Sequence, residues 1–444
     1  MRAQILPLIF LAFGLPLIAK SGDVLAQYES GPARSDGMSE LSRELLLGAQ
    51  PEDADGHSSR VELGSKTKRD EIKVHGELGR GITVDTGDQF SLRLGARVGL
   101  RYELSSTFDS ESQVHELEHR PSVSNLRLVL GGHALTRSLT YRIQLNLSPL
   151  HLRGGQNSPV FDAYMNYQFS EARGLRFGQF FVPFNRLRTI SDYALQLGSR
   201  SIAVREFSLH RDLGVRLEAN QLFGKDSPLT LQLGAFAGDG TQDHVWKKPG
   251  ALLTSRLELR PFGAFDDSID GDLSRRKQPA LALGAAFAAN LNASKDQSNS
   301  GALLSEGLRH FLHASTDLIF KWRGFAFQTE LIMRRSTVPS GLSGDRSLAE
   351  PTRDGYGATA QLSYLFFVPV EVVGRLAAID AWKDAHPDYL AQVEQTGREL
   401  ALGVNYYVRG HELKIQSDYS LLTPPGFPLN RANHLARIQI DASF

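Results

Sequence analysis

The chain of 444 residues contains no cysteine. This absence excludes a disulfide framework, thiolate metal ligands and thiol catalysis, and it suits an oxidising compartment in which stray thiols are a liability. The sequence also lacks a Walker-type phosphate loop and a Gly-x-Ser-x-Gly nucleophile motif. We therefore predict that the protein is not an enzyme and has no catalytic residue, no cofactor and no bound metal.

The chain also lacks net charge, because its 49 Lys and Arg residues balance its 49 Asp and Glu residues. With a hydrophobic content of 41% it is neither a disordered chain nor a polycation that would bind nucleic acid. Any electrostatic selectivity must therefore come from where the charges are placed. Lysine is scarce, since Arg outnumbers Lys about threefold, and guanidinium groups match phosphate oxygens in a bidentate manner that ammonium groups do not.

Long hydrophobic runs are missing beyond the N-terminus. Arg2 precedes an apolar run at 5–18, and residues 24–26 offer a signal-peptidase site, so residues 1–26 are predicted to be a cleaved signal peptide. The run is shorter than the ~20 residues that span a membrane as a helix. Residues 27–87 are polar and are predicted to be a periplasmic leader. An exported chain without spanning helices is either soluble or a membrane β-barrel, since only closed barrels satisfy a strand backbone in lipid.

Beyond residue 88 the chain shows long segments in which every second residue is apolar. Strands of a soluble sandwich are usually about five or six residues long, and these segments are longer. They lie at 90–102, 123–134, 139–148, 161–169, 175–184, 212–222, 229–237, 251–260, 281–289, 311–322, 325–334, 356–367, 370–379, 399–408, 413–421 and 433–444. Their even number is typical of outer-membrane barrels. We predict an all-β fold, a 16-stranded antiparallel transmembrane β-barrel at 88–444.

The connections alternate in length, as they do in such barrels, where short turns face the periplasm and long loops face outward. The short ones are 136–138, 170–174, 224–228, 323–324, 368–369 and 409–411. The long ones are 105–122, 149–159, 185–210, 239–250, 291–307, 336–354, 381–397 and 423–432. One connection departs from this pattern: 261–279 should be a short turn but is long and acidic. It contains either a hidden strand or an elaborated turn.

The last strand places Ala436, Ile438, Ile440, Ala442 and Phe444 in one stripe. An aromatic residue at this end of a strand fits the girdle at the membrane interface. A terminal Phe444 also resembles the signal read by the outer-membrane assembly machinery. We expect contacts with that machinery and with outer-membrane lipid.

The long connection at 185–210 is too long for a plain turn and is rich in arginine. With its flanking residues it carries Arg186, Arg188, Arg200, Arg205 and Arg211. The acids in the same stretch are Asp192, Glu206 and Asp212. This excess produces a local positive field. The sequence predicts an inward-folded third loop that lines an anion path.

If the apolar stripes face lipid, many arginines project into the lumen. The wall candidates are Arg93, Arg97, Arg101, Arg142, Arg216 and Arg256, with further basic residues at Arg127, Arg176, Arg260, Arg334, Arg375, Lys414 and Arg437. Carboxylates on the same face leave only a modest cationic excess, so each arginine could instead brace the barrel in an ion pair. Arg93, Arg97 and Arg101 are four residues apart and would form a ladder about 13 Å long.

Three segments carry a family resemblance: FDAYMNYQF, LRFGQFFVPFNRLR and RSIAVREFSLHRDLGV. They resemble the phosphate-selective porin O and P family, in which similar strand ends bracket the third loop. The resemblance implies a sixteen-stranded outer-membrane barrel, a homotrimer, whose third loop forms a cationic constriction for phosphate or related anions. By location, the family's loop arginines correspond to Arg186, Arg188, Arg200 and Arg205, whereas its lysine clusters are not matched.

The predicted function is passive diffusion of anions, phosphate or related oxyanions above all, through an arginine-lined constriction. A general or differently selective porin is the first alternative. An outer-membrane hydrolase or a non-conducting adhesive barrel is an alternative of another class.

One motif points elsewhere: residues 115–119 read HELEH, which satisfies the His-Glu-x-x-His pattern of zinc proteases. That chemistry needs a buried helix with both histidines on one face. The motif lies among polar residues, stops at Pro121 and falls in the predicted first external loop, where a solvated loop is expected.

Overall fold

The computed structural model describes residues 72–109, 114–152, 158–225, 227–241, 249–304, 307–337, 352–426 and 428–444. The predicted signal peptide and most of the predicted leader lie outside these residues. In the described part of the chain, no helix has the length and apolar character needed to cross a membrane.

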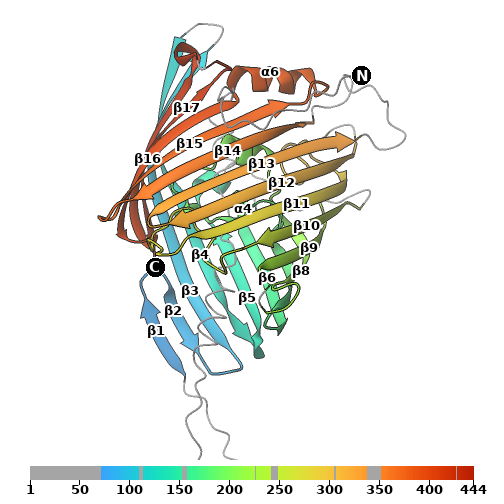
Figure 1. Ribbon diagram of the computed structural model, residues 1–444, viewed down its shortest axis with the longest axis vertical. Coiled ribbons are helices and arrows are strands. Elements are labelled where there is room, and N and C mark those ends of the chain that lie inside the picture. The colour runs from blue at the N-terminus through green and yellow to red at the C-terminus, as the bar shows by residue number, and fades with distance from the viewer. Residues whose placement is uncertain are drawn as a thin grey trace, which may run out of the picture.

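Sixteen antiparallel strands, β3 to β18, form a closed barrel, because β18 pairs with β3. The first eight are β3 Ser91–Asp109, β4 Val114–Ala134, β5 Thr136–Asn146, β6 Val160–Ser170, β7 Arg173–Phe181, β8 Arg211–Ala219, β9 Leu229–Phe236 and β10 Ala251–Leu259. The others are β11 Ala280–Ala293, β12 Arg309–Trp322, β13 Phe325–Thr337, β14 Gly355–Leu365, β15 Val370–Ala381, β16 Arg398–Arg409, β17 Leu413–Thr423 and β18 Asn433–Ser443. The predicted sixteen-stranded barrel is confirmed (Figure 1).

The alternation along each strand sorts apolar residues to the outside and polar residues to the lumen. On β3, Leu100 and Tyr102 are exposed on the outer face, whereas Arg101 and Glu103 between them are buried on the inner face. We call the end of the barrel with the short connections the turn end and the opposite end the loop end. The loop end carries α3 (Pro149–Leu152), α6 (Pro387–Thr396) and η2 (Leu429–Arg431).

Two short strands lie within the range predicted as leader. β1 (Lys73–Glu77) and β2 (Gly81–Asp85) form a hairpin. β2 pairs with β3 from Ser91 to Leu94, just beyond the last residues that pair with β18. The hairpin therefore prolongs the seam of the barrel past its turn end, where Figure 1 shows it below the C-terminus. The sequence did not predict these two strands, because each is only five residues long and the segment is largely polar.

The first long connection was predicted wrongly. The predicted loop 105–122 is mostly strand, because β3 and β4 continue as a paired ribbon from Leu100 and Val123 to Asp109 and Val114. The HELEH segment therefore lies in β4, not in a solvated loop and not in a helix. This polar segment forms a strand because its backbone groups form hydrogen bonds with the paired backbone of β3.

The connection between β10 and β11 is an elaborated turn, since no strand occurs from 260 to 279. It folds back toward the lumen, where Asp267, Asp270 and Asp272 are buried. Phe265 packs against Ala280, Ala282 and Ile319 on the inner faces of β11 and β12. The small inner residues of β11 leave room for this segment.

The hydrophobic core lies inside the barrel, between the third loop and the wall. Phe184, Ile190, Val204 and Phe207 of the loop belong to one buried cluster with inner residues of β11, β13 and β15. Gly357 on β14 permits this close approach, because a Cβ there would lie 2.8 Å from the Cβ of Ala203. This part of the loop therefore packs closely against β11, β13, β14 and β15.

Candidate functional site

Loop 3, residues 182–210, connects β7 to β8 and lies within the barrel (Figure 1). It contains α4 (Arg186–Thr189), η1 (Asp192–Ala194) and α5 (Ile202–Phe207). The hydroxyl of Ser201 caps α5 by accepting from the amide of Val204 at 3.3 Å. Between these short turns the backbone is irregular, so its polar groups need partners on the barrel wall.

Wall carboxylates accept from backbone amides of loop 3. The bonds are Leu187 to Glu330 at 2.9 Å, Gly198 to Asp418 at 3.0 Å and Ile202 to Glu399 at 2.7 Å. All three carboxylates come from the half of the wall formed by β13 to β17. Charge-assisted bonds of this kind are about twice as strong as neutral ones. The acidic residues of this half of the wall therefore hold the loop.

Wall cations satisfy the loop's carbonyl groups in the same way. The donors and acceptors are Arg256 to Phe184 O at 2.7 Å, Lys414 to Leu195 O at 2.6 Å, Arg101 to Gly198 O at 2.7 Å and Arg375 to Ser199 O at 2.7 Å. Two of the predicted wall arginines, Arg101 and Arg256, are thus engaged by the loop backbone.

Arg186 lies in a compensated network of six charges. Its side chain is fully buried and bonds Asp317 at 2.6 Å and Asp267, with Glu258 at 3.5 Å. Arg256 and Arg260 contact the same three carboxylates. Three cations therefore meet three anions, and Arg186 adds no net positive charge to the lumen.

The other predicted loop arginines also contact loop or wall groups. Arg200 bonds Asp192 at 2.8 Å, and Arg188 donates to Nδ1 of His210 at 3.1 Å. Arg211 bonds Asp162 at 2.9 Å. Arg205 is half-buried on α5. Their predicted role as a free cationic lining stays a prediction.

The tip of loop 3 reaches the opposite half of the wall. Asp192 forms an ion pair with Arg127 of β4, and the guanidinium of Arg97 lies 3.6 Å from the ring centroid of Tyr193. The loop therefore crosses the lumen. Any path through the barrel has to pass between the loop and the wall.

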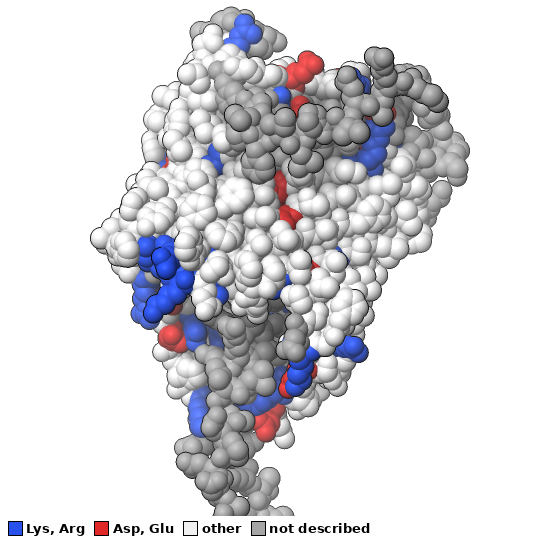
Figure 2. Space-filling view, viewed as in Figure 1, with Lys and Arg blue, Asp and Glu red and all other residues white. Residues whose placement is uncertain are grey.

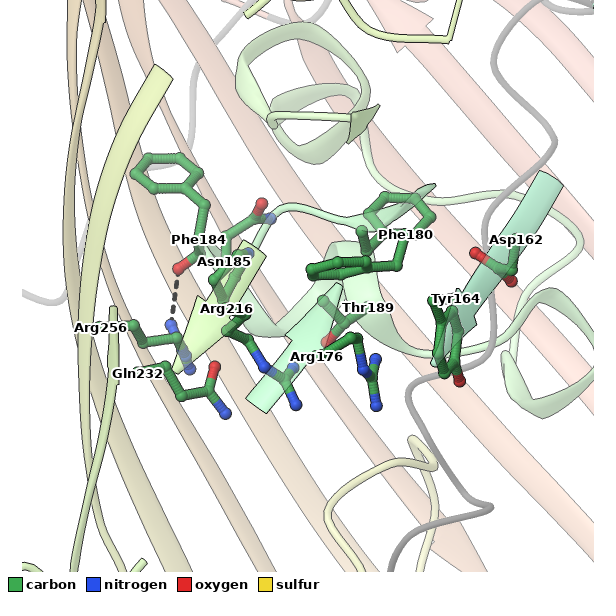
Figure 3. A pocket seen from close by; sticks show the side chains of 12 residues that line it. Asp162, Tyr164, Arg176, Phe180, Phe184, Asn185, Thr189, Arg216, Gln232 and Arg256 are labelled. Carbon is green, nitrogen blue, oxygen red and sulfur yellow. Dashed lines mark hydrogen bonds between the residues drawn. The ribbon is translucent and has the colours of Figure 1, made fainter. Parts of the chain in front are cut away.

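A pocket of about 30 Å³ lies between loop 3 and the wall of β6 to β10. We call it the constriction pocket. Its charged lining residues are Arg176, Arg216, Arg256 and Asp162. Figure 3 shows the side chains of Gln232, Arg216 and Arg176 side by side below loop 3. Arg256 is balanced within the network of Arg186, and Asp162 already bonds Arg211, which leaves Arg176 and Arg216 as the cations that face the pocket.

Arg176 and Arg216 stand directly opposite each other on β7 and β8. Like charges in this relation are destabilising. Arg176 donates to Asn166 at 2.6 Å and stacks 4.1 Å from the ring centroid of Tyr164, and Arg216 pairs with Glu218 at 2.7 Å. The buried Nε of Arg216 has no hydrogen-bond partner among the described residues. The pair presents two adjacent guanidinium groups to the pocket.

A larger cavity of about 470 Å³ lies at the turn end and shares Tyr164 with the constriction pocket. We call it the turn-end cavity. Its lining includes Arg80, Arg93, Arg97, Arg137 and Arg142, against the two carboxylates of Asp85 and Glu412. Arg93, Gly131 and Arg142 are successive partners across β3, β4 and β5. Because Gly131 has no side chain, the two arginines share an open stretch of wall.

The structure therefore divides the predicted residues into groups. Arg216 and Arg256 line the constriction pocket, and Arg93, Arg97 and Arg142 line the turn-end cavity. The residues that line neither cavity are Arg101, Arg186, Arg188, Arg200, Arg205 and Arg211. Strand alternation also indicated that Arg176 faces the lumen. Its position opposite Arg216 could not be predicted, because it depends on the register between β7 and β8, and no local sequence pattern specifies that register.

In the described part of the chain, no group of three or more histidine and carboxylate side chains has a geometry that could hold a metal ion. His115 and His119 of the HELEH segment lie on the outer face of β4. His115 is within 3.1 Å of the hydroxyl of Ser106, and His119 is within 2.6 Å of the hydroxyl of Tyr102. A strand places them far from the geometry of a zinc protease helix.

His210 gives a pH-dependent prediction for loop 3. Burial holds the pKa of His210 well below 6.5, and the positive charges of Arg188, Arg211, Lys295 and Arg200 lower it further. The unfolded chain binds a proton that the folded loop excludes, so stability is full above pH 6.5 and falls below it, by up to about 1.4 kcal/mol per pH unit. His210→Asn keeps an acceptor for Arg188 and is expected to show a shallower loss of unfolding free energy between pH 6.5 and 5. Parallel pH profiles for the variant and the parent would contradict this.

No protein-family model matches the chain, and no curated protein matches it. Solved structures do. OmpF of Salmonella typhi, in complex with daunomycin, is 12% identical with a TM-score of 0.52, over 81% of this chain and 98% of that one. An anion-selective porin from Comamonas acidovorans is 10% identical with a TM-score of 0.51, over 80% of this chain and 100% of that one. The outer membrane channel DcaP of Acinetobacter baumannii is 12% identical with a TM-score of 0.50, over 80% of this chain and 98% of that one.

At these identities the similarity shows the fold. The chain has a porin fold: a closed sixteen-stranded barrel with a loop inside it.

Proposed function

We propose that the protein is an outer-membrane channel for passive diffusion of anions. The observation that carries this proposal is the adjacent pair of Arg176 and Arg216 in the lining of the constriction pocket, where the one carboxylate is Asp162. The wall carboxylates Glu330, Glu399 and Asp418 are occupied by the backbone of the loop and do not line the constriction pocket. Anions would enter from or leave into the turn-end cavity, where Arg93, Arg97 and Arg142 extend the positive field.

In this proposal the apolar outer face contacts lipid, the turn end faces the periplasm and the loop end faces outward. Phe444 lies at the turn end, 52% exposed, with its amide bonded to Ala96 O at 2.8 Å. This position suits both the aromatic girdle and contact with the assembly machinery. The cleaved signal peptide and the homotrimer that the family resemblance implies are part of the same proposal. Transport by diffusion needs no covalent chemistry.

Oxyanions such as phosphate are the proposed preferred solutes. Two adjacent guanidinium groups offer parallel donors that match planar pairs of oxygens, whereas chloride takes only single contacts. The fixed charges of Arg176 and Arg216 would bind an oxyanion in the gap for part of each passage, and weak binding at several points lets it leave again.

Millimolar phosphate is therefore expected to block the chloride current of the purified channel in a planar bilayer. In Arg176→Lys/Arg216→Lys the two charges remain but the forked donors are lost, so block should weaken roughly tenfold while anion preference persists. Equal block in both proteins would place oxyanion binding outside the constriction pocket. Absence of block in the parent would leave a general anion-preferring channel and contradict the oxyanion proposal.

A further inference from the structure

A second cluster of cations lies at the turn end, away from the cavities. It consists of Arg275, Arg276 and Lys277 in the connection between β10 and β11, and Arg323 in the turn after β12. We call these four residues the basic rim. Figure 2 shows Lys and Arg side chains gathered at the left edge of the barrel, close to where the connection between β10 and β11 lies in Figure 1.

One buried carboxylate brings the two segments of the basic rim together. Asp272 accepts from the amide of Arg276 at 3.0 Å and from the amide of Gly324 at 2.8 Å. The amide of Arg323 donates to Arg276 O at 2.9 Å. Asp272 is 1% exposed, so it fixes the backbone of the rim and offers little neutralisation at the surface.

Two residues of the basic rim have strained backbone conformations. Arg275 and Arg323 have φ angles of 46° and 51°, a left-handed region that residues with a side chain rarely adopt. Such conformations persist only where surrounding contacts impose them. The long connection between β10 and β11 thus places arginine side chains at the turn end of the barrel.

Aromatic side chains border the basic rim. Arg275 lies 4.1 Å from the ring centroid of Phe367 and donates to the hydroxyl of Tyr364 at 3.4 Å. Trp322 donates from its indole nitrogen to Lys277 O at 3.3 Å. Phe367 is 91% exposed and Trp322 40% exposed. Aromatic rings at this level of a barrel sit between lipid tails and head groups.

None of the four cations forms an ion pair with a carboxylate of the described residues. Lys277 and Arg323 are exposed. Elsewhere at the turn end, basic side chains have acidic partners: Arg137 pairs with Asp88 and Arg409 pairs with Glu412. The basic rim is therefore a concentration of uncompensated positive charge beside an apolar surface.

We propose that the basic rim binds the phosphate of an anionic phospholipid in the periplasmic leaflet, with the acyl chains lying along Trp322 and Phe367. Lysine and arginine clusters next to a membrane attract anionic head groups by about 1 kcal/mol per charge. Guanidinium groups add forked hydrogen bonds to phosphate oxygens. This inference goes beyond anion conduction and rests on the proposed membrane placement and orientation.

The test compares lipid binding by the refolded full-length barrel and its variants in detergent micelles. Lys277→Gln/Arg323→Gln removes two exposed cations of the rim, and Lys225→Gln/Arg409→Gln removes two cations elsewhere at the turn end. Short-chain phosphatidylglycerol and phosphatidylcholine are titrated, and bound lipid is counted by native mass spectrometry. We expect phosphatidylglycerol to bind the parent and the control alike, and the rim variant roughly thirtyfold more weakly, as loss of about two charge contacts implies.

Three outcomes would overturn the inference. They are equal binding of the two lipids, equal loss in the control variant, and displacement of phosphatidylglycerol by equimolar inorganic phosphate, which would indicate a site for free phosphate. Arg275→Gln gives a second variant in which charge and the Phe367 contact are lost together. The anion-channel proposal fails separately, since a barrel without anion preference can still bind the lipid.

Discussion

Replacing both Arg176 and Arg216 with glutamine is expected to abolish the anion preference of the channel. The lining of the constriction pocket would change from three cations and one carboxylate to one of each. A unit charge at 4 Å contributes about 4 kcal/mol at an effective dielectric constant of 20. Even a third of this value is about tenfold in permeability, so the ratio of anion to cation permeability should fall at least roughly tenfold. The measurement is the reversal potential of each protein in a salt gradient.

The matched control removes the same two charges from exposed sites. Lys73 and Lys225 line neither cavity, so Lys73→Gln/Lys225→Gln should keep the parent's reversal potential. An unchanged reversal potential in Arg176→Gln/Arg216→Gln would place the selectivity filter elsewhere. The arginines of the turn-end cavity would then be the next candidates.

Replacing Arg186 with methionine is expected to destabilise the barrel strongly. The substitution leaves Asp317, Asp267 and Glu258 with two cations instead of three in a buried network. Removing one partner of a buried ion pair costs about 3–5 kcal/mol, because the remaining charge is uncompensated. The free energy of unfolding, measured by denaturant titration in lipid vesicles, should fall by that amount.

A double variant separates lost charge balance from lost packing. Arg186→Met/Asp317→Asn restores equal numbers of cations and anions and should recover part of the stability. Arg335→Met serves as the control, because its pair with Asp384 is partly exposed and such pairs contribute at most about 1 kcal/mol. An Arg186→Met barrel as stable as the Arg335→Met barrel would show that loop 3 is not held by the network.

The barrel was predictable because its signal is repeated. Each strand alternates, and sixteen alternating segments with short and long connections leave few other folds. The failures have local causes. In the ribbon of β3 and β4, the residues around Leu117 are mostly polar at both odd and even positions. The sequence therefore shows no alternation from which this part of the strand pairing could be predicted. The hairpin of β1 and β2 is too short for its period to be read.

The candidate site was only partly predictable, because the number of arginines in a segment does not show which of them form ion pairs with carboxylates. Loop 3 is rich in arginine, but Arg186 and Arg200 are bonded to carboxylates, Asp317 on the wall and Asp192 within the loop itself. Those contacts depend on which half of the wall the loop packs against, and small residues such as Gly357 decide that. Alternation placed Arg176 and Arg216 in the lumen, but only the register of β7 and β8 sets them opposite each other.

The most direct measurement is the reversal potential of the unmodified channel in a planar bilayer with a tenfold gradient of potassium chloride. The cationic lining of the constriction pocket predicts a potential with the sign set by chloride. A potential with the sign set by potassium would contradict anion selectivity. A refolded barrel that inserts but carries no current would contradict a channel altogether.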